Sequence, residues 1–272
     1  MKRMLLSLAA LVAMQAAAQA GPPVNGLKLD TYFSQGWNTT LATTNGNSVN
    51  QGAPSTVSIL ESTWVDTGAV GGVNRHDITL SPDLGVSNQL FDIDDSFSVW
   101  TTVTLGAVSN TPRKEAGFHI ISGVTGTSSF IINSDAGEIV AFGGGAPFKL
   151  FGNNGGGNGY VPGTPILMGF TMRAAGDGVG PLDNTIEYFI DRGLGLETSG
   201  PLAYSNLEGG PVNYSVSMYS QAAPFAAAPL TEVVSTTFAN IRYSATPIPE
   251  PATVALGAMG LIGLAAIRRR LR

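Results

Sequence analysis

Apolar and polar residues alternate with a period of two along much of this chain. Residues 96–105 read SFSVWTTVTL, residues 164–173 read TPILMGFTMR, and residues 214–219 read YSVSMY. Successive side chains of a β-strand point to opposite faces of its sheet, so this alternation predicts strands with one buried face. Seven further strands are predicted over residues 56–60, 76–80, 115–122, 128–133, 138–142, 184–191 and 236–243. Between the two ends of the chain, no segment of ten or more residues carries the stripe of a helix.

Turn signals rich in glycine, asparagine and aspartate separate these segments, as at Asn45-Gly46 and Asp177-Gly178. The 35 glycines supply the positive φ angles that many tight turns need. About ten strands in one segment predict an all-β fold, a two-sheet β-sandwich. Two small domains are the alternative. Residues 26–51 are polar and rich in asparagine and threonine, and they are expected to form an edge strand and a loop.

The C-terminal end is different in character. Residues 252–267 form an uncharged apolar run, which as a helix would extend about 24 Å, somewhat short of the roughly 30 Å hydrocarbon core of a bilayer. Three consecutive arginines follow, Arg268, Arg269 and Arg270. Such a cluster stops translocation and stays on the cytoplasmic side. The pattern predicts a transmembrane helix over 252–267, with the bulk of the chain outside the cell.

A Pro-Glu-Pro tripeptide, Pro249, Glu250 and Pro251, precedes the apolar run. Its prolines break any helix and hold the chain extended, as a processing site requires. The order of tripeptide, small-residue apolar helix and basic residues resembles the PEP-CTERM signal of exported bacterial proteins. This resemblance implies that residues 247–272 are a sorting signal. It also implies that an exosortase, a membrane-spanning cysteine transpeptidase of Gram-negative bacteria, cuts the chain near the tripeptide. The protein would then move from the cytoplasmic membrane to the cell surface or the medium.

The N-terminal end predicts export through the Sec translocon. Lys2 and Arg3 precede an apolar stretch over residues 4–13, and small residues at Ala18 and Ala20 match the positions that a signal peptidase reads. We therefore expect residues 1–20 to be a signal peptide and residues 21–246 to be the exported domain. An uncleaved N-terminal anchor is the alternative, which the short apolar core disfavours.

Charge and cysteine content exclude several classes of function. The chain has 14 basic and 19 acidic residues; leaving out Lys2, Arg3, Glu250 and the four arginines after residue 267 gives 8 basic and 18 acidic residues. A domain with this net charge of −10 is not expected to bind nucleic acid, because such binding depends on neutralising phosphates. The absence of cysteine excludes disulfides, thiolate metal sites and a cysteine nucleophile.

The order of the predicted strands is similar to that of concanavalin A-like and laminin-G-like sandwiches. The similarity covers about residues 91–244 and depends on SFSVWTTVTL followed by EAGFHIIS, on NTIEYFIDRGLG, and on the closing strand TTFANIRYS. It implies a jelly-roll sandwich. Domains of this class include glycoside hydrolases and carbohydrate-binding modules, so both activities have to be weighed against the residues present.

Candidate catalytic groups are few. Only two histidines are present, and no Gly-x-Ser-x-Gly elbow accompanies them. His76 is expected on the surface beside Asp77, and His119 is expected as a hydrogen-bonded or half-exposed strand residue. Glu187 and Asp191 share one strand face, but their Cα atoms would stand about 13 Å apart, beyond the spacing of a glycosidase pair. We expect them on a solvated face leading into a turn, and we expect no enzymatic activity.

Two binding sites are predicted in loops. Asp92, Asp94 and Asp95 place three carboxylates before a strand, an arrangement that can bind Ca²⁺, although aspartates also serve as turns and gatekeepers there. No other cofactor is expected. Trp64 and Tyr160 are candidates to contact a glycan, because aromatic rings stack on sugars. The alternative is that both loops serve structure alone.

Two hypotheses of function follow. In the first, the chain is a non-enzymatic surface or matrix protein that is processed by exosortase and recognises extracellular polysaccharide. In the second, it is a hydrolase of the concanavalin A-like class that acts on polysaccharide. Because no acid pair is recognisable, the first is favoured.

Overall fold

The computed structural model describes the central part of the chain and assigns no helix to it. The described residues are 21–32, 37–44, 55–64, 74–107, 113–123, 126–152, 159–174, 184–204, 213–222 and 234–247. None of them forms a helix long and apolar enough to cross a membrane. The predicted signal peptide, residues 1–20, and the predicted transmembrane helix, residues 252–267, lie outside this part.

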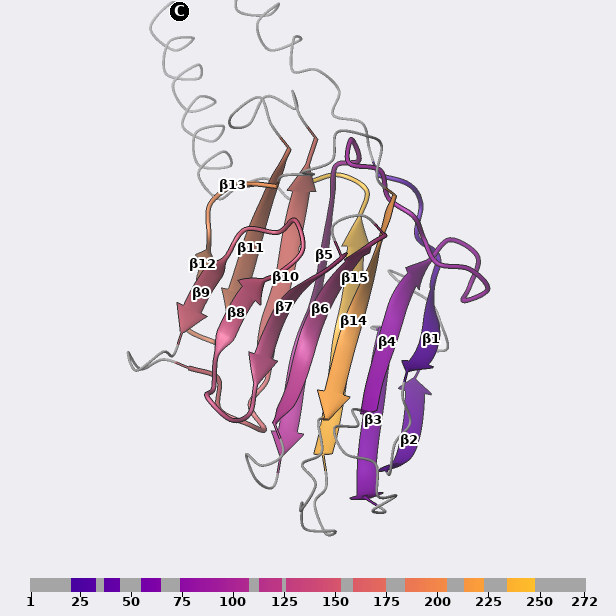
Figure 1. The fold of residues 1–272 in the computed structure, drawn as a ribbon, viewed down its shortest axis with the longest axis vertical. Helices are drawn as coiled ribbons and strands as arrows, with labels where there is room; N and C mark the ends of the chain where they lie inside the picture. Colours follow the sequence, from indigo (N-terminus) through magenta and orange to yellow (C-terminus); the bar gives the residue numbers. More distant parts are fainter. Residues whose placement is uncertain are drawn as a thin grey trace, which may run out of the picture.

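The described residues contain fifteen strands (Figure 1). In chain order they are β1 (Gly26–Tyr32), β2 (Trp37–Thr44), β3 (Ser55–Trp64), β4 (Asn74–Ser81), β5 (Phe97–Ala107), β6 (Lys114–Ser122), β7 (Gly126–Asn133), β8 (Ile139–Phe142), β9 (Lys149–Gly152), β10 (Ile166–Arg173), β11 (Thr185–Asp191), β12 (Leu196–Thr198), β13 (Leu202–Ala203), β14 (Tyr214–Ala222) and β15 (Val234–Ser244). All ten strands predicted from alternation are present. The structure adds β1, β2, β9, β12 and β13.

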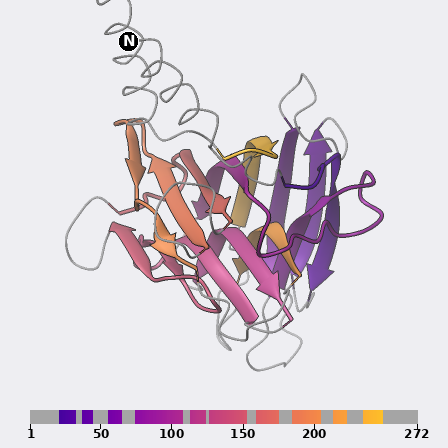
Figure 2. The ribbon, with the colours of Figure 1, turned by 90° about the horizontal axis from the view of Figure 1, so that it is seen from above.

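The strands form two antiparallel sheets that face each other, the predicted two-sheet sandwich (Figures 1 and 2). One sheet has seven strands in the order β1-β4-β14-β6-β7-β8-β9, and the other has the order β12-β11-β10-β5-β15-β3-β2, with β13 paired to β11. Each sheet takes strands from both halves of the chain, which a division into two small domains would not produce. Residues 26–51 contribute two edge strands, one to each sheet, rather than one strand and a loop.

Alternation along the strands decides which side chains fill the space between the sheets. On β14, Tyr214, Val216 and Met218 belong to the core, as the sequence pattern predicts. Aromatic rings connect the two sheets: Phe170 of β10 lies 5.6 Å from Phe118 of β6, measured between ring centroids. Even-numbered residues of β4, β6 and β14 therefore face the core. Odd-numbered residues of these strands lie on the opposite side, which we call the outer face.

The closing strand β15 contains an irregularity near its C-terminal end. Its pairing with β3 shifts between Ala239 and Ile241, and Asn240 between them has a φ of 55°. Asparagine tolerates this left-handed conformation better than most residues. The register with β5 also shifts here, between Ala239 and Arg242, and beyond the shift Ser244 lies opposite Ser98.

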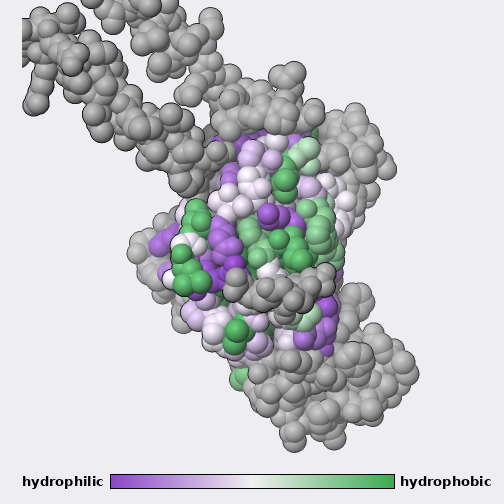
Figure 3. All heavy atoms as spheres, turned by 90° about the vertical axis from the view of Figure 1, so that its left-hand side faces the viewer, coloured by the Kyte–Doolittle hydropathy of each residue, from purple (hydrophilic) through white to green (hydrophobic). Residues whose placement is uncertain are grey.

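Isolated apolar side chains remain exposed near the edge strands β9 and β12. Phe148 precedes β9, and Leu194 and Leu196 lie at the turn into β12 and in that strand. The view of this side shows apolar areas separated by hydrophilic ones (Figure 3). Exposed apolar residues of this kind are ordinary on a protein surface.

Candidate functional site on the outer face of the seven-stranded sheet

Three strands bring polar side chains together on the outer face. Asp77 on β4 lies opposite Tyr219 on β14, and His119 on β6 lies opposite Ser217 of β14. All four side chains have odd numbers and point away from the core. They are nevertheless buried, whereas Arg75 beside them is partly exposed, at 23% of its side chain.

Asp77 is the centre of this group. Its carboxylate accepts hydrogen bonds from Arg75 Nε at 2.8 Å, from Ser217 Oγ at 3.2 Å and from His119 Nδ1 at 3.2 Å. Burial opposes ionisation, but the hydrogen bond from His119 and the hydrogen bond and charge of Arg75 lower the pKa of Asp77 overall. Asp77 is therefore an anion held by three donors at neutral pH.

The bond to Asp77 fixes the tautomer of His119. Burial lowers the pKa of His119, against the opposing effect of Asp77, so the ring is neutral at pH 7 and carries its proton on Nδ1. Among the described residues, this is the hydrogen bond that the imidazole makes, which leaves Nε2 as a proton acceptor. An acidic partner on Nδ1 is the arrangement that orients a histidine for proton transfer.

Tyr219 covers the imidazole. The two rings are stacked with centroids 3.6 Å apart and planes inclined by 23°. The guanidinium carbon of Arg75 lies 5.9 Å from the centre of the Tyr219 ring. Ile131 and Val140 pack beside this ring in a small apolar cluster on the outer face. Tyr219 is opposite Gly117 of β6.

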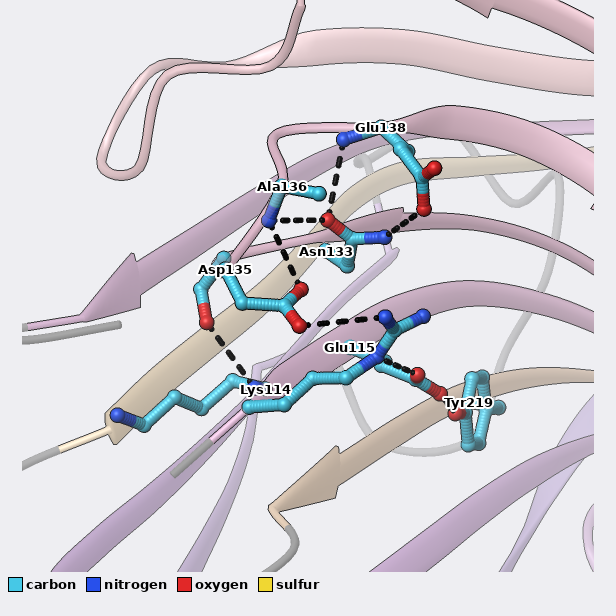
Figure 4. A network of polar contacts seen from close by, with 9 residues as sticks. Lys114, Glu115, Asn133, Asp135, Ala136, Glu138 and Tyr219 are labelled. Carbon is cyan, nitrogen blue, oxygen red and sulfur yellow. Dashed lines mark hydrogen bonds and ion pairs between the residues drawn. The ribbon is translucent and has the colours of Figure 1, made fainter. Parts of the chain in front are cut away.

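A second polar network continues from Tyr219 toward the turn between β7 and β8 (Figure 4). The Tyr219 hydroxyl bonds to Glu115, and Glu115 is paired with Arg113. Arg113 also reaches Asp135 in the turn at 3.3 Å. Burial and the bond to Glu115 raise the pKa of Tyr219 well above its usual range, so the phenol stays protonated.

Sequence analysis did not find this site, and it misplaced two candidate catalytic residues, His76 and Glu187. His76, predicted on the surface, is 2% exposed, because it has the same parity as the core residues Ile78 and Leu80. Glu187, predicted on a solvated face, is also buried. Asp191 does form the predicted turn, because its carboxylate accepts the N–H groups of Gly193 and Gly195.

Tyr160 does not present its ring to a glycan as predicted. It is 5% exposed and belongs to the core. Its hydroxyl donates toward the carbonyls of Leu105 and Thr164 and accepts the N–H of Leu105 at 2.7 Å. Tyr160 therefore holds a loop against β5. Trp64 is the last residue of β3, and its side chain lies outside the described residues.

The predicted calcium ligands form a compact turn before β5. The N–H of Asp92 donates to the Asp95 carboxylate at 2.7 Å, and the N–H of Asp95 donates to the carbonyl of Asp92 at 3.1 Å. Burial, with the charges of Asp92 and Asp94, raises the pKa of Asp95. Within the described part of the chain, no three His, Asp or Glu side chains converge on a point that could hold a metal ion. Calcium binding at this turn stays a prediction.

The predicted processing residues lie outside the described residues. These are Ala18 and Ala20 at one end, and Pro249, Glu250, Pro251, Arg268, Arg269 and Arg270 at the other. The last described strand, β15, ends at Ser244, so the sorting tail begins close to the end of the sandwich.

Comparison with solved structures finds distant sandwiches. An alginate lyase of polysaccharide lyase family 7 is 10% identical with a TM-score of 0.44, over 74% of this chain and 82% of its own. A Chlorella virus alginate lyase is 14% identical with a TM-score of 0.42, over 87% and 96%. The carbohydrate recognition domain of Emp46p is 10% identical with a TM-score of 0.39, over 78% and 89%. Similarities of this size say nothing about activity.

Comparison at the level of sequence identifies the tail. No curated protein matches the chain. Residues 247–270 match the PEP-CTERM protein-sorting motif, which confirms the sorting signal predicted there. The motif indicates an exported protein that is held at the membrane by its C-terminal region before an exosortase processes it. The chain therefore consists of an all-β sandwich followed by a PEP-CTERM sorting motif.

Proposed function

We propose that the sandwich is a cell-surface or extracellular module that binds polysaccharide on the outer face of the seven-stranded sheet, without turnover. The observation that carries this proposal is a set of partly exposed polar side chains from neighbouring strands around the buried His119–Tyr219 stack. Sugar sites need a few placed hydrogen-bonding groups, and the outer face offers them over adjacent strands.

Half-buried polar side chains flank the stack and remain available to a ligand from solvent. In the register of the sheet, Gln221 of β14 lies between Arg75 of β4 and Glu115 of β6. Ser129 of β7 lies opposite His119. All four flanking side chains are partly exposed. They supply both donors and acceptors, which suits the hydroxyl groups of a sugar chain.

A second candidate function uses the same face for catalysis. The neutral His119 keeps Nε2 as a base, and Asp77 orients it. An oriented histidine can accept a proton during cleavage of a polysaccharide. Asp77 is fully engaged in hydrogen bonds, so the usual pair of free carboxylates of a glycosidase is not available around it.

Binding and product formation on a polysaccharide panel separate the two functions. The exported protein is tested for glycan-array binding, for release of reducing ends and for formation of unsaturated ends. We expect binding that falls at least tenfold in Gln221→Ala and is unchanged in Thr102→Ala, a control on the outer side of the other sheet. Product that is lost in His119→Gln while binding persists supports the enzyme instead. A panel with neither binding nor product overturns both.

Processing of the tail is expected to leave a measurable mass. We infer that exosortase cuts near Pro249, Glu250 and Pro251, because these residues precede the apolar run within the matched motif. Mass spectrometry of the surface-located protein should show that the residues after the tripeptide are missing. A variant with Glu250→Ala and Pro251→Ala should keep them and stay in the membrane fraction. An intact Arg272 on surface-located wild-type protein would contradict this inference.

A further inference from the structure

The backbone nitrogen of Gly21 has two acceptors at the end of the sandwich. It lies 2.9 Å from the carbonyl oxygen of Ser96 and 2.8 Å from that of Ala245. Ser96 directly precedes β5 and Ala245 directly follows β15, two neighbouring central strands of the eight-stranded sheet. The beginning of the exported domain is thus fastened to the point where the sorting tail starts.

A peptide nitrogen cannot make two good hydrogen bonds to two acceptors at these distances. An amide has one N–H, which must be shared between the two carbonyls, whereas an α-ammonium group has three N–H bonds and a positive charge. Hydrogen bonds from a charged donor are also stronger than those from a neutral amide. The two carbonyls therefore match an N-terminal ammonium group better than a peptide bond.

The surroundings of Gly21 are equally specific. Gly21 is buried, and a Cβ atom there would lie 2.6 Å from the Tyr243 hydroxyl and 3.0 Å from Cβ of Phe97. Tyr243 donates its hydroxyl hydrogen to the carbonyl of Pro22 at 2.6 Å. The Asp95 carboxylate is near enough to raise the pKa of Tyr243, so a negative charge lies close to this site. A glycine whose α-amino group carries a positive charge fits this site.

We propose that removal of the predicted signal peptide after Ala20 creates an α-ammonium group on Gly21 that binds in this site. The ammonium group donates to the carbonyl oxygens of Ser96 and Ala245 and is favoured by the nearby negative charge of Asp95. Signal-peptide removal therefore completes the end of the sandwich and fixes the residue from which the sorting tail leaves it. The proposal is independent of any glycan-binding function.

The test compares two chains that differ in one residue. Both run to Arg272 in detergent micelles and are released from a cleavable leader, so that one begins at Gly21 and the other at Ala20. We expect the protein that begins at Gly21 to have a melting temperature several degrees higher. Trypsin should also cut it several-fold more slowly after Arg242, which lies in β15. Acetylation of the Gly21 amine should abolish both differences.

A second pair separates the ammonium group from the neighbouring hydroxyl. Tyr243→Phe in both chains removes the hydrogen bond to Pro22 and leaves the two carbonyls in place. In this pair, the chain that begins at Gly21 should still have the higher melting temperature and the slower trypsin cleavage. Equal melting temperatures and equal cleavage rates in the first pair would overturn the proposal. An exported protein whose first residue by mass is not Gly21 would overturn it as well.

Discussion

The Gly117→Ala protein is expected to lose about 3 kcal/mol or more of its free energy of unfolding. A Cβ atom at Gly117 would lie 2.1 Å from the carbonyl oxygen of Phe130 and 2.8 Å from Cα of Ile131. Both are backbone atoms of β7, so no side-chain rotation relieves the clash. Gly117 also has a φ of 154°, which side chains other than glycine rarely adopt. The substitution must therefore separate β6 from β7.

Denaturant unfolding of the mature protein measures this loss. Gly123→Ala is the matched control in the turn after β6, because a Cβ atom there would meet nothing within 4 Å. The control should change the free energy of unfolding by no more than about 0.5 kcal/mol. Equal free energies of unfolding for the two variants would contradict the close approach of the β7 backbone to Gly117.

Replacement of Asp77 by alanine is expected to destabilise the protein by about 3 to 5 kcal/mol. The loss arises because three donors keep their places while their common acceptor disappears: Arg75, His119 and Ser217. A buried donor without a partner costs more than the lost bond itself contributes. Asp77→Asn should cost less, since the amide oxygen can still accept from one of the three donors.

The same unfolding measurement tests this prediction. Asp94→Ala serves as the control for loss of a negative charge, because Asp94 is exposed in the turn before β5. It should change stability by about 0.5 kcal/mol or less. An Asp77→Ala protein as stable as the Asp94→Ala protein would mean that the carboxylate is not the shared acceptor of this network. Because Asp77→Asn is expected to be less destabilising than Asp77→Ala, it is the variant to use in assays of function on the outer face.

Local pattern was sufficient to predict the main strands but not the edges of the sheets. Residues such as those of β10 and β14 alternate over a long enough run to identify a strand and its buried face. By contrast, β9, β12 and β13 have four, three and two residues, too few for a period to be recognised. Edge strands also pair on one side only, so their sequences are less restricted.

The candidate site was hidden for a different reason. Asp77, His119 and Tyr219 come from β4, β6 and β14, and only the pairing of these strands places them together. No residue spacing within one strand records which strand lies next to it. Parity alone, applied to β4, would have placed His76 with Ile78 and Leu80 and left Asp77 on the outer face. It would not have found the partners of Asp77.

The position of the last two strands has a consequence for the order of folding. β14 lies between β4 and β6, and β15 lies between β5 and β3, so each sheet has one of them in its interior. In a chain that crosses a membrane N-terminus first, the seven-stranded sheet remains open until residue 222 has emerged, and the eight-stranded sheet remains open until residue 244 has emerged. The residues that arrive next belong to the sorting motif. A chain held there by its tail would finish folding beside the membrane, before it is cut and released.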